Sequence, residues 1–127
     1  MDNAGANRFA TQWAEHWNSH DLEGLLSHFS DDVVWTSPVA AQIVEGSDGV
    51  LRGKVMLRAY YAEGLRLTPE LHFEVIGVYQ GVNTIVINYR NHRGALVNEV
   101  LSFDDAGLVR EGHGTYLGSG ASAATGQ

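Results

Sequence analysis

The spacing of apolar residues changes once along the chain, near Pro69. Before that point Phe9, Trp13 and Trp17 recur every four residues, which places them on one face of a helix. After it, apolar and polar residues alternate with a period of two, and turn residues separate the segments. The strands predicted from this alternation span residues 71–80, 83–90, 95–103 and 108–117. Helices followed by a meander of strands indicate an α+β domain with an antiparallel sheet.

The region between the first helix and the strands contains several shorter elements. Asp21 is placed to cap a second, short helix, and residues 33–35 are typical of a short strand that Pro38 stops. Residues 39–52 are predicted to form a loop or a weak hairpin. Gly53 opens a third helix, so three helices are expected before the meander.

Length and composition restrict the class of protein. The 127 residues fit one domain, expected at 7–117, with flexible ends at 1–6 and 118–127. Cysteine is absent, no apolar run is long enough to span a membrane, and the first residues lack a secretory signal, so we expect a cytoplasmic protein. The net charge is −7 and no stretch is basic, which argues against nucleic-acid binding.

The length of the turn at Arg93-Gly94 determines which residues of the two flanking strands pair with each other. A loop of two or four residues would pair even positions before the turn with odd positions after it. Both faces of the sheet are then largely apolar, and the helices can cover only one, so we expect a homodimer through the outer sheet face. The terminal segments are the alternative cover. One predicted face carries Val86, Asn88 and Arg90 with Val97, Glu99, Leu101 and Phe103, and the other carries Ile85, Ile87 and Tyr89 with Leu96, Asn98, Val100 and Ser102.

A curved sheet wrapped around helices leaves a hollow in which a small hydrophobic ligand can bind. Glu99 lies between Val97 and Leu101 on the face predicted to point inward, where loss of solvent would raise its pKa and suit it to acid–base catalysis. The structural alternative is that Glu99 pairs with Arg90 or hydrogen-bonds Asn88 across the hairpin.

Other residues are candidates for lining this hollow. At least one of the three tryptophans is expected to touch the ligand, although each is equally suited to core packing. Tyr60 and Tyr61 are adjacent on a helix, and we expect only Tyr60 to face the hollow, with a structural hydrogen bond as its alternative role. The candidate ligand contacts predicted from the residues are Trp13, Trp17, Trp35, Ser37, Leu57, Tyr60, Val86, Asn88 and Leu101.

Six histidines raise the question of a metal site. His16 and His20 share a helix face only if the helix continues past Asn18, and we expect it to end there. No metalloprotease-type pattern is present, so neither a metal nor another cofactor is predicted. His113 is expected to point outward, or inward as a base if its strand is bulged.

Nearly the whole chain, residues 7–116, resembles nuclear transport factor 2-like and SnoaL-like domains. The resemblance rests on the order and spacing of several segments, among them residues 18–25, 28–35, 51–53 and 103–109. It implies a cone of three N-terminal helices on a curved, mostly antiparallel sheet, the cystatin-like fold. It does not specify an activity, because related domains include isomerases, cyclases, epoxide hydrolases, dehydratases and binding domains.

Among the catalytic members, the ketosteroid isomerases give the nearest overlay. It places Glu99 where that family keeps a protonated carboxylic acid, and Tyr60 near a supporting tyrosine. It places Ser37 at the catalytic base and Trp13 at the donor tyrosine, so standard steroid isomerisation is not implied. The overlay also turns three residues of the last strand inward, adding candidate ligand contacts at Gly112, Gly114 and Tyr116, and the two glycines would widen the hollow.

Two principal hypotheses follow from the sequence. One is a cofactor-free acid–base enzyme, of isomerase, cyclase or lyase type, that acts on a small hydrophobic or aromatic substrate through Glu99. The other is a non-catalytic ligand-binding domain with the same pocket. A domain that serves only for dimerisation is a third, weaker reading, in which side chains fill the hollow.

Overall fold

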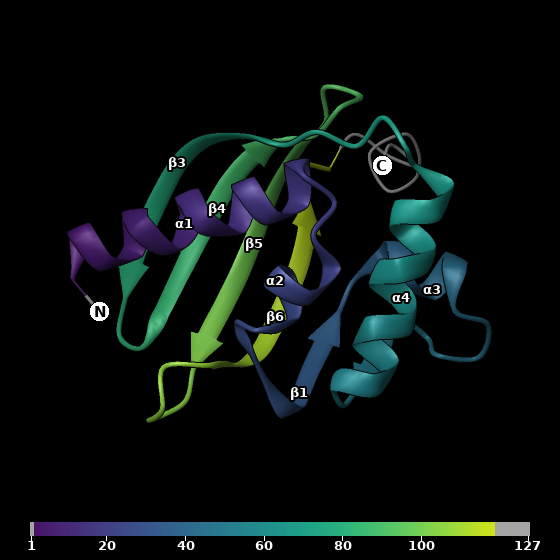
Figure 1. The fold of residues 1–127 in the computed structure, drawn as a ribbon, viewed down its shortest axis with the longest axis horizontal. Helices are drawn as coiled ribbons and strands as arrows, with labels where there is room; N and C mark the ends of the chain where they lie inside the picture. The colour runs from purple at the N-terminus through teal and green to yellow at the C-terminus, as the bar shows by residue number, and fades with distance from the viewer. Residues whose placement is uncertain (1, 119–127) are drawn as a thin grey trace.

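The computed structural model describes residues 2–118 of the chain as four helices and one six-stranded sheet (Figure 1). The helices are α1 (Asn3–Asn18), α2 (Leu22–Leu26), α3 (Pro38–Ile43) and α4 (Lys54–Leu67). The strands are β1 (Phe29–Thr36), β2 (Val50–Arg52), β3 (Glu74–Gly81), β4 (Thr84–Arg90), β5 (Leu96–Phe103) and β6 (Val109–Tyr116). The flexible tail expected at 118–127 lies, apart from Gly118, outside the described residues.

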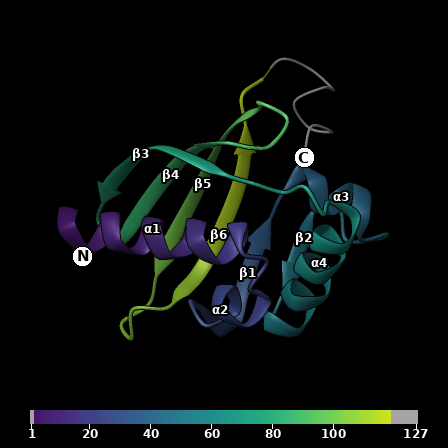
Figure 2. The ribbon, with the colours of Figure 1, turned by 45° about the horizontal axis from the view of Figure 1, so that its top comes forward.

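The sheet confirms the predicted α+β class. Its strand order is β2-β1-β6-β5-β4-β3, and every neighbouring pair is antiparallel except β1 with β6. Helices α1, α2 and α4 lie on the same side of this sheet (Figure 2). The core between these layers is therefore enclosed by the helices and the inner face of a mostly antiparallel sheet, as expected for a cystatin-like cone.

Helix α1 packs on the sheet through the predicted apolar face. Phe9, Trp13 and Trp17 are buried, and the helix ends at Asn18, as expected. Its start differs from the prediction, because the Asp2 side chain accepts a hydrogen bond from the Gly5 N–H and caps a helix that begins at Asn3. Most of the segment expected to be a loose end is thus the first turn of α1.

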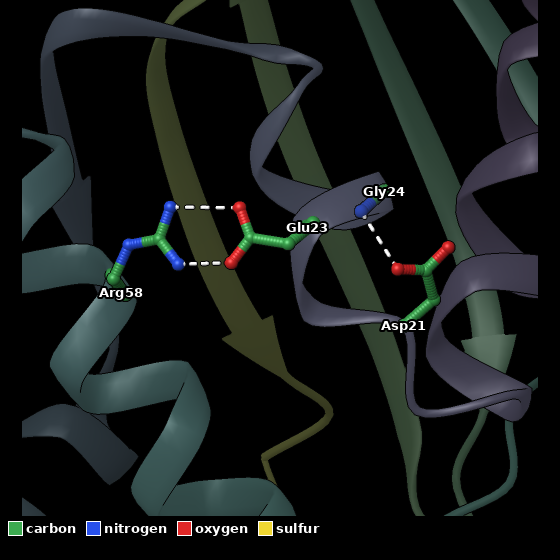
Figure 3. Close-up of polar contacts among 4 residues, drawn as sticks. All are labelled: Asp21, Glu23, Gly24 and Arg58. Atoms are coloured by element: carbon green, nitrogen blue, oxygen red, sulfur yellow. Dashed lines mark hydrogen bonds and ion pairs between the residues drawn. The ribbon is translucent and has the colours of Figure 1, made fainter.

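Helix α2 is short, and polar contacts hold its N-terminal end. Its cap is Asp21, as predicted, whose carboxylate accepts a hydrogen bond from the Gly24 N–H at 2.9 Å. Glu23 forms a two-pronged ion pair with Arg58 on α4 (Figure 3). These contacts connect α2 to α4, although the exposure of the ion pair limits its contribution to stability.

Residues 39–52 are more ordered than the loop or hairpin that their sequence suggested. Ser37 caps α3 by accepting a hydrogen bond from the Val39 N–H at 3.1 Å, and Pro38 occupies the first helical turn, where its missing N–H costs nothing. The chain then returns as β2, which pairs with β1. The described helices therefore number four rather than the three expected.

The hairpin between β4 and β5 corrects the predicted assignment of faces. Arg90 pairs with Leu96, so five residues lie between the paired positions, and the Asn91 side chain organises them by accepting hydrogen bonds from the N–H groups of Arg93 and Ala95. An odd loop pairs odd positions with odd positions. Glu99 accordingly faces Ile87 across the ladder, and Val86 and Asn88 lie on the opposite face of the sheet.

The outer face of the sheet carries a row of cross-strand neighbours. Tyr79 pairs with Val86, Val86 with Val100, and Val100 with His113. Tyr79 is largely exposed and the other three are partly exposed. Within residues 2–118, no helix is long and apolar enough to cross a membrane.

Candidate functional site

A pocket lies between α4, the end of α1 and the inner face of the sheet. The space between its walls is about 560 Å³ when the open solvent at its mouth is included. Half of the fourteen lining residues are aromatic, so the walls are mainly rings with a few polar groups between them. The aromatic residues are Trp17, Trp35, Tyr60, Tyr61, Phe73, Tyr89 and Tyr116.

Glu99 carries the carboxyl group in this lining. It lies in the middle of β5, between buried Val97 and Leu101, and only 4% of its surface is exposed. Within the described part of the chain, no group donates a hydrogen bond to its carboxylate. Burial alone raises the pKa of Glu99 to about 8, because the ionised form loses hydration without gaining a partner. At neutral pH the group is therefore mainly protonated.

The two structural roles considered for Glu99 are not found. The Arg90 guanidinium lies 3.9 Å from Glu74 and donates to the Gly94 carbonyl oxygen. The Asn88 amide donates to the Asn98 side chain at 2.8 Å. Arg90 and Asn88 sit at even positions, on the face away from Glu99, because of the odd hairpin loop. For the same reason Val86 and Asn88 do not line the pocket that was predicted for them.

Three hydroxyl groups lie in the polar part of the pocket around Glu99. Burial raises the pKa of Tyr60 to about 12, and hydrogen bonding from the Ser37 side chain offsets part of that effect. Burial also raises the pKa of Tyr116, which interacts with Ser37 in the same way. Both phenols are therefore neutral at physiological pH and act there as hydrogen-bonding groups rather than as bases.

Gly114 provides room for this polar group of side chains. A Cβ atom added there would lie 3.2 Å from Glu99 Oε1 and 3.5 Å from Ser37 Oγ, so both groups approach the bare strand backbone. Gly112, also turned inward as predicted, does not widen the pocket. The ring of Trp35 occupies its space, at 2.5 Å from where a Cβ would stand. The ring thus forms a wall of the pocket.

Several candidates belong to the core instead. Trp13 is fully buried against Phe73 and Tyr89, with ring centroids 5.7 and 5.1 Å away, and does not line the pocket. Leu57 and Leu101 are likewise fully buried outside the lining. Of the tryptophans, Trp17 and Trp35 reach it.

Other lining residues were missed by the sequence reasoning. Tyr61 lines the pocket together with Tyr60, although only Tyr60 was expected to face it. Phe73 comes from the segment between α4 and β3, which carries no regular pattern. Tyr89 and Glu99 both have odd numbers, so the five-residue hairpin loop places them on the same face of the sheet. Had that loop length been known, the position of Tyr89 in the lining could have been predicted.

The histidines described here lie in different parts of the fold, apart from one neighbouring pair. His16 Nδ1 and His28 Nε2 lie 3.1 Å apart at the junction of α1 with the start of β1. His113 points to the outer face, where its ring contacts Thr36 Oγ1 at 2.6 Å and Glu111 Oε1 at 2.8 Å. Residues 2–118 contain no group of three or more His, Asp or Glu side chains that could hold a metal ion.

The geometry of the domain agrees with its similarity to known proteins. The family model described as a SnoaL-like domain matches residues 10–116. The chain belongs to the SnoaL-like family. A SnoaL-like protein of unknown function from Burkholderia thailandensis is 39% identical, and the match covers 93% of this chain and 98% of that one with a TM-score of 0.88. No curated protein matches the chain.

Two more distant structures share the fold. A SnoaL-like protein of Agrobacterium tumefaciens, for which isomerase activity has been suggested, is 16% identical, with coverages of 89% and 97% and a TM-score of 0.69. AclR of Streptomyces galilaeus, for which hydroxylase activity has been suggested, is 20% identical, with both chains covered to 98% and a TM-score of 0.72. At these identities the likeness establishes the SnoaL-like fold and leaves the activity open.

Proposed function

We propose that this SnoaL-like domain binds a small hydrophobic or aromatic molecule in the pocket and acts on it by cofactor-free acid–base chemistry. Glu99 is the group that takes and gives the proton, in a reaction of isomerase, cyclase or lyase type. The observation that carries the proposal is the burial of Glu99 in an aromatic pocket without a described hydrogen-bond donor. Structural carboxylates are normally satisfied by such donors, whereas a catalytic one keeps its capacity for the substrate.

The surroundings of Glu99 suit proton transfer near neutral pH. A pKa of about 8 lets the group exchange its proton in either direction with a small driving force. The hydroxyl groups of Tyr60, Ser37 and Tyr116 are placed to orient a polar atom of the substrate. Glu99 and Tyr60 are buried among the aromatic rings of the pocket, and the low local polarity strengthens each of these interactions.

Exchange of carbon-bound protons provides the test. 2-Tetralone, a two-ring ketone with acidic α-protons, would be incubated in D₂O with the wild-type protein, with Glu99→Gln and with the surface control Glu74→Gln, and deuteration followed by NMR. We expect the wild type and the control to accelerate exchange, and Glu99→Gln to lose about 10²–10⁴-fold of that acceleration. Equal acceleration by all three proteins would contradict the role of Glu99.

A non-catalytic ligand-binding domain is the second candidate. It is favoured by the fact that Tyr60 and Tyr116, the phenols near Glu99, keep their protons at physiological pH and so do not serve as bases there. Binding of 2-tetralone to the pocket without any acceleration of exchange in the wild type would support this candidate against the first.

We also propose that the domain forms a homodimer through the outer face of the sheet. The support is the row formed by Tyr79, Val86, Val100 and His113, in which the first three residues present partly exposed apolar surface across β3, β4 and β5. A second copy of the same face is self-complementary by symmetry and would cover this surface.

A further inference from the structure

Among the described residues that line the pocket, Glu99 is the carboxylic acid, and neither lysine nor arginine is present. The titratable groups that face Glu99 from the surrounding elements are Tyr60 and Tyr61 on α4, Tyr89 on β4 and Tyr116 on β6. None of them is cationic in any protonation state. No lysine or arginine is among the described residues that line the pocket, and His92, in the β4–β5 loop, has its Nε2 3.9 Å from Glu70 Oε1.

The aromatic rings that line the pocket add further negative potential to that of the carboxyl group. Tyrosine and tryptophan rings carry negative potential on their faces, and a cation within about 6 Å of such a ring is attracted to it. Trp17, Trp35, Tyr60, Tyr61 and Tyr116 all contribute to the lining around the carboxyl group. The carboxylate and the aromatic faces therefore both attract a cationic ligand, and both disfavour an anionic one.

We propose that the ligand of this pocket is a small organic cation, an amine or quaternary ammonium group joined to a ring or a short apolar chain, whose charge neutralises Glu99. The cation lies against the aromatic walls with its charge beside the carboxylate, and its apolar part fills the remaining space. This inference rests on the proposed function, because it takes the same pocket to be the ligand site.

Binding of a cation changes the protonation of Glu99. The carboxyl group releases its proton to water as the cation enters, because a positive charge beside it favours the ionised form. With a pKa of about 8, roughly one molecule in ten is already ionised at pH 7, so this step reduces the affinity only about tenfold at that pH. The resulting carboxylate is the form that can accept a proton from the bound ligand, so the ligand itself prepares the base.

The test compares two probes of nearly equal shape and different charge. Benzyltrimethylammonium is a permanent cation, and neopentylbenzene replaces its nitrogen with carbon. Their affinities would be measured by tryptophan fluorescence at pH 6.5 and pH 8.5, with the wild type, with Glu99→Gln and with Glu74→Gln. Glu74 is an exposed residue of β3, so Glu74→Gln controls for the loss of one carboxylate.

We expect the cation to bind the wild type at least tenfold more tightly than neopentylbenzene at pH 8.5. Its affinity should rise between pH 6.5 and pH 8.5 by about 20-fold, following the ionisation of Glu99. Glu99→Gln should abolish this rise and weaken binding of the cation at pH 8.5 at least tenfold, with the affinity for neopentylbenzene unchanged within threefold. Glu74→Gln should behave as the wild type.

The outcomes separate this inference from the proposed function. If neopentylbenzene binds as tightly as the cation, or if the affinity for the cation is independent of pH and of Glu99, the inference is overturned and the pocket remains a site for neutral hydrophobic molecules. If neither probe binds to the wild-type protein, both the inference and the proposed ligand site are overturned.

Discussion

The carboxyl group of Glu99 makes the stability of the folded domain depend on pH. Its pKa is about 8 in the folded protein and near the ordinary value of 4.5 when the chain is unfolded. The folded state therefore holds a proton that the unfolded state has lost between these two pH values. The stability of the folded state therefore falls as the pH rises. The contribution of Glu99 to stability is complete below about pH 4.5 and is lost as the pH rises through about 8.

Glu99→Gln should remove this dependence, because the amide resembles the protonated acid in shape and does not ionise. We expect the difference in unfolding free energy between the variant and the wild type to grow in favour of the variant from pH 5 to pH 8.5, approaching about 5 kcal/mol. Urea denaturation across this pH range measures it. A difference that stays constant with pH would mean that Glu99 is hydrated in the folded state.

Gly112 and Gly77, both in the sheet, differ in the space available for the Cβ atom of an alanine. At Gly112 the Cβ of alanine would stand 2.5 Å from the Trp35 ring, whereas at Gly77 its nearest contact is the Tyr79 ring at 3.8 Å. We expect Gly112→Ala to lower the unfolding free energy by about 1–3 kcal/mol, and Gly77→Ala to change it by less than about 1 kcal/mol. Equal effects in urea denaturation would show that Trp35 does not depend on Gly112.

The pairing of helix α1 with the segment that enters β1 depends on two histidine rings. His28 Nε2 lies 3.1 Å from His16 Nδ1, and burial, together with the neighbouring His16, lowers the pKa of His28. A lowered histidine pKa means that the stability provided by the neutral ring is complete above the unfolded value of 6.5 and is lost as the pH falls below it. Acid should therefore weaken this junction.

His28→Gln should reduce the loss of stability between pH 7 and pH 5, because glutamine does not take up the proton that the unfolded His28 ring binds in this range. The exposed His72 provides the matched control, because His72→Gln leaves the junction intact. Thermal unfolding at several pH values measures the effect. The account of the junction fails if the two variants respond to acid in the same way.

Sequence periodicity was sufficient for the elements that pack an apolar face. The α1 face of Phe9, Trp13 and Trp17 and the alternating strands of the meander were predicted, since burial imposes their periods. Helix α3 was missed because its six residues are too few to display a period, and only the cap at Ser37 and Pro38 indicated it. Short elements depend on capping and on tertiary contacts, which a pattern of apolar residues does not encode.

The candidate site was predicted only in part, because the face on which a strand residue lies depends on a loop length that the sequence pattern does not encode. The inward direction of Glu99 was expected, although Val86 and Asn88 were assigned to the same face in error. Gly94 signalled a turn, but the sequence did not indicate that the Asn91 side chain would organise a five-residue loop. One residue of loop length reverses the face of every preceding position, so an assignment of faces is only as accurate as the loop length.

At the scale of the whole molecule, one face of the sheet supports the core and pocket while the other is partly exposed. The inner face is buried under the helices, whereas the outer row of Tyr79, Val86, Val100 and His113 is partly exposed. A homodimer through this row would leave the pocket, on the opposite face, accessible to ligand.

The proposed dimer predicts a mass of twice 13.8 kDa in size-exclusion chromatography with light scattering. We expect Val100→Glu to shift the protein to the monomer, because a charge would be buried at the centre of the interface. Val55→Glu, on the exposed surface of α4, should remain dimeric. A monomeric wild type, or a Val100→Glu variant that stays dimeric, would exclude this interface.

The most direct test of the account is the ionisation of Glu99 itself in the folded protein. A ¹³C NMR titration would follow its side-chain carboxyl carbon between pH 4 and pH 10, with Glu99→Gln used to assign the signal. A midpoint near 8 is predicted for an acid that is buried in an aromatic pocket without a partner. A midpoint near 4.5 would contradict the account, because it would require a carboxylate that is hydrated or already paired.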